Sequence, residues 1–212
     1  MQFEQLYRNV LSENIGDVIK VGVFPGAFKP PHVGHYTTAL NACKENDKIY
    51  IYISSKPREL STQNKSSGGD DSARYSSMFK TDKYTDKLLS VQAAEVARMT
   101  SASAMRTAIT LKDKNTVYKN LPDSVDQDAI YNILMQSIDI SNDNYGMISA
   151  AQTVEIWQHY KRALMSQTNK SDQDIVINVS DVTPVRDTYE LVDTLNNSQN
   201  ASKISVRLYV GT

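Results

Sequence analysis

Residues 18–53 read V-I-K-V-G-V-F-P-G-A-F-K-P-P-H-V-G-H-Y-T-T-A-L-N-A-C-K-E-N-D-K-I-Y-I-Y-I, and this stretch decides the fold class. It begins with a β-rich run at residues 18–24 and ends with a second one at residues 48–53. Between the two runs, a turn rich in proline and glycine leads into a helical stretch from about Val33 to Glu45. Strand, loop, helix and strand at this spacing predict a parallel crossover unit.

The rest of the chain continues the alternation of helices and strands. The sequence predicts four more helices, at residues 103–111, 125–138 and 150–165 and from residue 184 to about 195. It also predicts two more strands, at residues 174–179 and 204–210. We therefore expect an α/β fold with a Rossmann-like parallel sheet and flanking helices. In such sheets, ligands bind beyond the carboxyl ends of the strands.

Three of the expected helices carry recognisable start signals. Ser124 with Gln127 and Ser149 with Gln152 have the spacing of capping boxes. Thr183 followed by proline predicts the start of a last helix, which runs to about residue 195.

Composition excludes several classes of protein. The 212 residues carry a formal net charge of −1, which argues against a disordered tail and against a basic protein that wraps nucleic acid. No apolar run approaches the 18 residues of a membrane-spanning helix. The single cysteine, Cys43, excludes an internal disulfide and a cysteine-ligated structural zinc site. We expect a cytoplasmic protein whose partners include neither nucleic acid nor membrane.

Two segments are predicted along the chain. Residues 1–16 form an N-terminal helical segment, with apolar side chains at helical spacing, and residues 17–212 form a single domain. The segment M-Q-F-E-Q-L-Y-R-N-V-L-S-E-N resembles the head-targeting peptides of some tailed-phage internal proteins. The alternative is an amphipathic helix that packs on the domain or on a second subunit.

The motif that carries chemistry is F-P-G-A-F-K-P-P-H-V-G-H, at residues 24–35. His32 and His35 are three residues apart at the start of a helix and so share one face, while Gly34 between them leaves room for a bulky group. A helix N-terminus favours anions, and two imidazoles add hydrogen-bond donors. This pattern predicts a polyphosphate site. Zinc is a weaker interpretation because the third histidine, His159, lies in a different helix.

The same stretch resembles a family signature. The pattern G-x-F-x-P-x-H-x-G-H is similar to that of the HxGH nucleotidyltransferase superfamily, which includes nicotinamide-mononucleotide, pantetheine-phosphate and FMN adenylyltransferases and the cytidylyltransferases. The family's second signature, I-S-S-T-x-x-R, resembles T-S-A-S-A-M-R at residues 100–106. The resemblance implies a nucleotidyltransferase type of Rossmann-like fold. It also places Ser101, Ser103 and Arg106 on phosphate-contacting positions.

The resemblance implies a reaction and a role for each residue. An acceptor phosphate would attack the α-phosphorus of a nucleoside triphosphate and release pyrophosphate, with Mg²⁺ as cofactor and no protein residue needed as general base. His35 would stabilise the α-phosphate in the transition state and His32 would hold the triphosphate. Arg106 and Lys29 would assist them. Nucleotide binding is further assigned to Phe24, Gly26, Ala27, Gly34, Ser101, Ser103, Gly211 and Asp71.

Two features depart from the family pattern. Ala27 stands where the family often has arginine or threonine, which removes one phosphate donor that Lys29 could replace. The order of two blocks is also exchanged, because residues 70–138 precede residues 150–212 here and follow them in the relatives. Natural shuffling or a rewiring of the chain could each produce this order. It predicts that Thr212 lies close to Asp70 and Asp71.

The acceptor is the least determined part of the site. Residues at the ends of two predicted strands are candidates for holding it, namely Ser54, Lys56, Thr183 and Arg186. The alternative for Arg186 is a salt bridge at the start of its helix. The resemblance favours transfer of AMP from ATP onto nicotinamide mononucleotide, a step of NAD biosynthesis.

Other functions and locations stay open. CTP in place of ATP, pantetheine phosphate as the acceptor, and a non-catalytic nucleotide-binding phage protein are the alternatives. Several blocks resemble phage-encoded members, which would place the protein in the host cytoplasm or in the virion. A homo-oligomer is left open.

Overall fold

The structure is a computed structural model, and it describes residues 18–56, 58–59, 75, 86–94, 96, 102–138 and 147–210. Several sequence predictions fall outside these residues. They are the helical segment at residues 1–16, the site candidates Ser101, Asp71 and Gly211, and the expected proximity of Thr212 to Asp70 and Asp71.

The core of the fold is a five-stranded parallel sheet, which confirms the predicted fold class. Its order is β4-β7-β1-β2-β6, and its strands are β1 (Ile19–Gly26), β2 (Lys48–Ser54), β4 (Ser90–Ala94), β6 (Ile175–Ser180) and β7 (Ile204–Tyr209). A separate antiparallel pair joins β3 (Arg58–Glu59) to β5 (Met147–Ile148).

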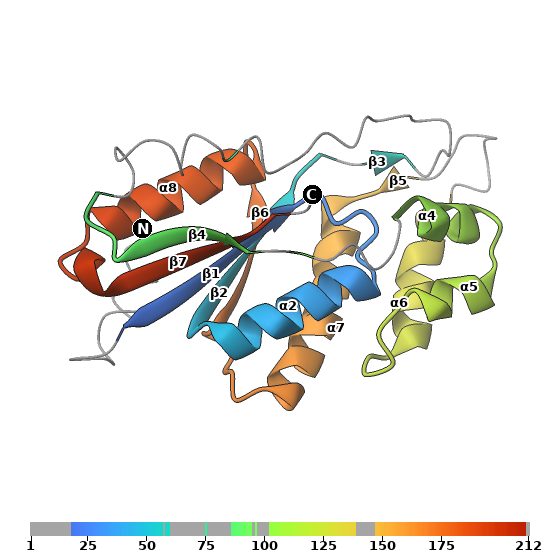
Figure 1. Cartoon of the computed structure of the whole chain (residues 1–212). Coiled ribbons are helices and arrows are strands. Elements are labelled where there is room, and N and C mark those ends of the chain that lie inside the picture. Colours follow the sequence, from blue (N-terminus) through green and yellow to red (C-terminus); the bar gives the residue numbers. More distant parts are fainter. Residues whose placement is uncertain are drawn as a thin grey trace.

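Helices cover both faces of the sheet (Figure 1). One face carries α2 (Val33–Glu45) and α7 (Ala150–Gln167), and the other carries α8 (Pro184–Asn196), which is followed by the short 3₁₀ helix η3 (Ala201–Lys203). Beyond the carboxyl ends of the strands lies a group of three helices, α4 (Ala102–Thr110), α5 (Lys114–Lys119) and α6 (Gln127–Met135). No helix in the described ranges has the length and apolar character needed to cross a bilayer.

Strand β2 shows why the sheet is buried on both faces. Its isoleucines, among them Ile51, join the core beneath α2 and α7, while Tyr50 and Tyr52 join the core beneath α8. Because successive residues of a strand point to opposite faces, the run K-I-Y-I-Y-I supplies both cores at once.

Most start signals seen in the sequence are confirmed. Helix α2 has the predicted bounds, and the capping box of Ser149 and Gln152 opens α7. Thr183 caps α8, with its hydroxyl oxygen accepting a hydrogen bond from the Arg186 amide at 3.2 Å.

The capping box predicted at Ser124 and Gln127 is wrong. The N-cap of α6 is Asp126, whose carboxylate accepts a hydrogen bond from the Ala129 amide at 2.9 Å. The Ser124 hydroxyl instead donates to the Tyr36 hydroxyl at 3.1 Å. A carboxylate two residues nearer the helix displaces the serine as cap and releases it for a long-range bond.

The strand order bears on the exchanged blocks. When residues 147–210 are placed ahead of residues 86–138, the sheet order becomes 3-2-1-4-5, that of the first five strands of a doubly wound sheet. In addition, Glu59 of β3 pairs with Met147 of β5, so residues from the two sides of the first exchanged block lie side by side. The exchange of the two blocks therefore changes the order of the strands along the chain and leaves a doubly wound arrangement in space.

Candidate functional site

The motif at residues 24–35 leaves the central strand β1 at its carboxyl end and enters α2. Phe28 has a φ of 50°, in the left-handed region that side-chain-bearing residues rarely adopt. A Cβ on Gly26 would lie 2.7 Å from the Phe28 ring, so only glycine fits beneath this ring. Phe28 therefore occupies the space over Gly26, a residue that the family resemblance assigned to nucleotide binding.

The two histidines form a stacked pair at the start of α2. Their ring centroids are 3.7 Å apart with an interplanar angle of 25°. Nδ1 of His35 accepts a hydrogen bond from the His32 amide at 3.2 Å, and Nδ1 of His32 accepts one from the Gly34 amide at 3.2 Å. Because each Nδ1 acts as an acceptor, the neutral rings carry their proton on Nε2. Nε2–H is therefore the group through which each ring could donate to an anion.

The amides at the start of α2 are bonded within the protein. The amide of Val33 donates to the carbonyl of Asn120 at 2.8 Å, and those of His32 and Gly34 donate to the imidazoles. These three amides are therefore not free to bind phosphate. The dipole of α2 still favours negative charge here, but the imidazoles must supply the hydrogen bonds.

Aromatic rings form a wall behind His35. The Phe28 ring meets the imidazole edge to face at 5.0 Å between centroids, and Phe24 packs on Phe28 at 4.8 Å. The fully buried Trp157 of α7 packs against Phe28 and completes the wall, with 5.2 Å between the two ring centroids. Trp157 is thus part of the core, and Phe24 lines the wall behind the site.

Burial keeps both imidazoles neutral at pH 7. It lowers the pKa of His32 from 6.5 to about 4. Burial, and then the charge of the neighbouring His32, lowers the pKa of His35 well below its usual value. The unliganded site therefore presents two neutral donors.

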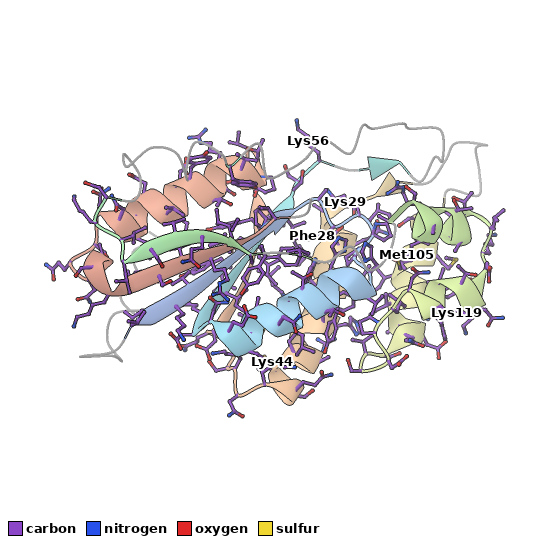
Figure 2. The ribbon with its side chains drawn as sticks, viewed as in Figure 1. Phe28, Lys29, Lys44, Lys56, Met105 and Lys119 are labelled. Carbon is purple, nitrogen blue, oxygen red and sulfur yellow. The ribbon has the colours of Figure 1, made fainter. Side chains whose placement is uncertain are left out.

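Lys29 ties the loop to the end of β2. Its side chain is 3% exposed, and its ammonium group donates to the carbonyl of Ser54 at 2.5 Å and to the carbonyl of Lys56. Phe28 and Lys29 lie beside each other at the carboxyl end of β1 (Figure 2). The structure thus brings Ser54 and Lys56 to the same edge as the histidine loop, and it gives Lys29 a supporting role in that loop.

The second motif meets the first through Arg106. This side chain of α4 is 6% exposed, and its Nη1 donates to the carbonyl of Lys29 at 3.4 Å. Its Nη2 donates to the hydroxyl of Ser103 at 2.8 Å. Two motifs more than 70 residues apart in sequence therefore converge on one loop.

Other candidates are not drawn into this cluster. Arg186 forms an exposed ion pair with Glu190 at 2.7 Å, which is the alternative that the sequence allowed for it. Thr183 is engaged as the cap of α8, on the opposite face of the sheet from α2. Ala27 is exposed at the turn, and Gly34 is buried between the two histidines.

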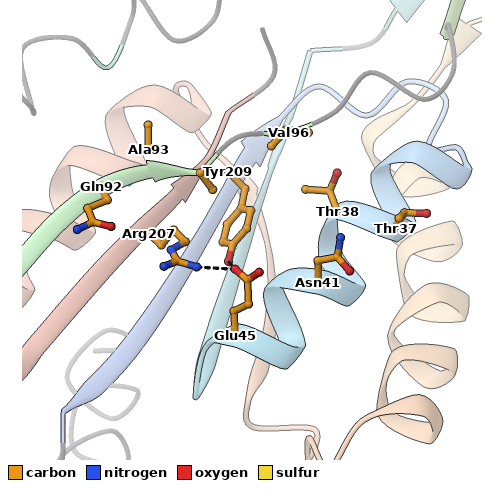
Figure 3. A pocket seen from close by; sticks show the side chains of 10 residues that line it. Thr37, Thr38, Asn41, Glu45, Gln92, Ala93, Val96, Arg207 and Tyr209 are labelled. Carbon is orange, nitrogen blue, oxygen red and sulfur yellow. Dashed lines mark hydrogen bonds and ion pairs between the residues drawn. The ribbon is translucent and has the colours of Figure 1, made fainter.

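A cavity of about 280 Å³ lies between α2, β4 and β7 (Figure 3). Glu45 pairs with Arg207 at 2.6 Å on one side of it and accepts a hydrogen bond from the Tyr209 hydroxyl at 2.9 Å. The cavity is lined by Thr37, Thr38, Asn41, Glu45, Gln92, Ala93, Ala94, Val96, Arg207 and Tyr209. No sequence motif indicated this cavity, although the polar alternation of I-S-V-R-L-Y marks one uncovered face of β7.

The described part of the chain holds no cluster of three or more histidine, cysteine, aspartate or glutamate side chains arranged to bind a metal. A dedicated Mg²⁺ cage is therefore not among the residues described. Comparisons with protein-family models, with curated proteins and with solved structures find no match. Function must be inferred from the residues of the site.

The lowered pKa of His32 predicts acid sensitivity of the fold. The unfolded chain takes up a proton on His32 near pH 6.5, whereas the folded protein does so only near pH 4, so stability should fall as the pH drops between these values. A tenfold difference in proton affinity corresponds to about 1.4 kcal/mol. Protonation of His32 alone should therefore lower the free energy of unfolding by roughly 3 kcal/mol as the pH falls from 6.5 to 4.

Urea unfolding at several pH values would measure this loss. Carboxylates also titrate in this range, so the reference is His32→Asn, which keeps an N-cap residue that does not titrate. The difference in the free energy of unfolding between the wild-type protein and the variant should shrink as the pH falls from 6.5 to 4. Parallel pH profiles of the two proteins would contradict the assignment.

Proposed function

We propose that this protein is a nucleotidyltransferase that moves a nucleoside monophosphate from a nucleoside triphosphate onto a phosphorylated acceptor and releases pyrophosphate. One observation carries the proposal: the stacked pair of His32 and His35 shares a loop with the backbone carbonyl that Arg106 contacts. A row of imidazole donors beside a guanidinium suits a chain of phosphoryl groups, because each presents N–H groups to anionic oxygens.

This reaction requires alignment of the acceptor phosphate with the α-phosphorus more than it requires proton transfer by the protein. A phosphate monoester has its second pKa near ~6, so the acceptor is already a nucleophilic anion at neutral pH. In-line attack on the α-phosphorus forms the new P–O bond as the bond to pyrophosphate breaks. Catalysis then requires positioning, together with donors where negative charge accumulates.

The histidines and Arg106 divide this work. His35 would donate Nε2–H to the α-phosphate as charge builds up there, and His32 would hold the adjacent phosphates. Arg106, kept in place by Ser103 and the Lys29 carbonyl, would hold the β- and γ-phosphates. Because a nearby phosphate favours the charged imidazole, binding should be accompanied by proton uptake. Mg²⁺ would arrive as part of the substrate, bound to phosphate oxygens and water.

The cavity beside α2 suits the nucleoside part of the substrate. It begins one helical turn beyond Gly34, with Thr37 and Thr38 at that end, and the carboxamides of Asn41 and Gln92 could hydrogen-bond a base. We include ATP as the preferred donor and nicotinamide mononucleotide as the preferred acceptor, as the family resemblance suggests. CTP and pantetheine phosphate are the alternatives.

The test is a matrix of the four nucleoside triphosphates against several phosphorylated acceptors, with Mg²⁺, scored by pyrophosphate formed. One productive pair is expected. Titration with inorganic tripolyphosphate measures binding to the histidine site separately. Tripolyphosphate binding without pyrophosphate from any pair would instead indicate a non-catalytic nucleotide-binding protein, which Ala27 and the exchanged block order favour. Absence of both would overturn the proposal.

A variant in the cavity separates base recognition from phosphate recognition. Asn41→Ala should raise the KM for the preferred triphosphate by up to about tenfold, the worth of one hydrogen bond, while tripolyphosphate affinity stays unchanged. Asn115→Ala, an exposed amide on α5, is the matched control and should change neither value. Equal KM values for Asn41→Ala and wild type would remove the nucleoside from this cavity.

A further inference from the structure

We propose that Trp157 is a positioning residue of the histidine site. Acting through Phe28, it fixes the ring of His35 in the orientation and tautomer that donate Nε2–H to a phosphate. The catalytic consequence rests on the proposed function, whereas the positioning itself is measurable without any substrate.

A continuous series of ring contacts connects Trp157 to both histidines. The indole meets the Phe28 ring at 5.2 Å and an angle of 73°, and Phe28 meets His35 at 5.0 Å and 83°. His35 in turn stacks on His32. Edge-to-face contacts of this kind favour one relative orientation of the two rings. Trp157 therefore acts on the site across a single intervening side chain.

Phe28 can transmit this contact because its own position is fixed. Its backbone lies in the left-handed region, and its ring sits directly over the Cα of Gly26. The indole of Trp157 packs edge to face against that ring. A smaller residue at position 157 would leave a gap below Phe28 and let the ring drop away from His35.

The indole is retained here at a cost. Trp157 is fully buried, and its Nε1–H has no hydrogen-bond partner among the described residues. An unsatisfied buried donor is unfavourable, and a phenylalanine would avoid it. The size and shape of the indole, and not its N–H, are therefore what the site uses. Trp157 is also the single tryptophan of the chain, so its fluorescence reports directly on this wall.

NMR of labelled histidine side chains tests the inference in the unliganded protein. In Trp157→Leu, the pKa of His35 should rise toward 6.5 by about one unit or more, because water enters behind the ring, and a second tautomer should appear. Trp157→Phe keeps an aromatic ring in contact with Phe28 and should change the pKa and the tautomer of His35 less. The titratable group that acts on His35 in the structure is His32, so its titration is followed in the same spectra.

The control is Leu164→Ala, a fully buried position on the same helix without a ring contact to Phe28. It should lower the melting temperature comparably while the His35 titration stays that of the wild type. In the pyrophosphate assay, Trp157→Leu should lower kcat about tenfold with little change in the KM for the triphosphate, because binding contacts remain.

Phe28→Leu extends the test to the intervening ring. It should reproduce the His35 changes, and combining it with Trp157→Leu should add little, as expected for two residues acting in series. If His35 titrates in Trp157→Phe and in a folded Trp157→Leu as it does in the wild-type protein, the positioning role is overturned. If no substrate pair yields pyrophosphate, the NMR result still decides it, so failure of the reaction and failure of the positioning are distinguishable.

Discussion

Replacing His35 with alanine is expected to lower turnover about 10²- to 10³-fold while the protein remains folded. The magnitude is that of removing one donor aimed at charge which develops in the transition state. Folding should survive because the ring of His35 is not fully buried and accepts a single backbone hydrogen bond, from the His32 amide. The Gly34 amide keeps its bond to His32, so the helix start stays capped.

Pyrophosphate release with the best substrate pair measures this loss. His159→Ala is the matched control, because the third histidine of the chain lies on α7, outside the loop. It should stay within about twofold of wild-type turnover, and both variants should show a circular dichroism spectrum like that of the wild type. Near-normal turnover of His35→Ala would remove His35 from the reaction.

The central sheet and its first crossover were predictable because their local signals agree. The run at residues 48–53 alternates two kinds of apolar side chain, and the helix at residues 33–45 begins after a proline-rich turn. Each element therefore specified its own type and length without reference to distant residues.

Strand β4 could not be recognised in the same way. Its sequence, S-V-Q-A-A, has little β-propensity, and it becomes a strand because β7 pairs with it at the edge of the sheet. The pairing of β3 with β5 is likewise set by tertiary contact across about 90 residues. At α6, the carboxylate of Asp126 caps the helix, and Ser124 bonds to the hydroxyl of Tyr36, a partner 88 residues away that the local sequence does not indicate.

The candidate site was likewise predictable from the sequence only in part. Motif spacing predicted the face shared by His32 and His35, and the resemblance of residues 100–106 to a family signature singled out Arg106. It did not predict that the helix amides bond to the imidazoles and to Asn120, or that Trp157 supports the loop. Those contacts join segments far apart in the chain, and their geometry exists only after the core has packed.

Arg106→Ala is expected to lower kcat/KM for the triphosphate by about 10²- to 10³-fold and to weaken tripolyphosphate binding. The guanidinium is buried, and it is held by the Lys29 carbonyl and the Ser103 hydroxyl. A charge oriented in this way meets phosphate oxygens without paying to order a flexible side chain. Titration calorimetry with tripolyphosphate, beside the pyrophosphate assay, would measure both effects.

Arg106→Lys distinguishes orientation from charge. A lysine keeps the positive charge but cannot reproduce the planar fork that spans Lys29 and Ser103, so it should recover only a small part of the lost activity. Arg186→Ala is the control, since that arginine is exposed and paired with Glu190, and it should change kcat/KM less than threefold. Full activity of Arg106→Lys would mean that only net charge matters here. A large loss in Arg186→Ala would return that residue to the acceptor site and weaken the case for a site built around α2 and α4.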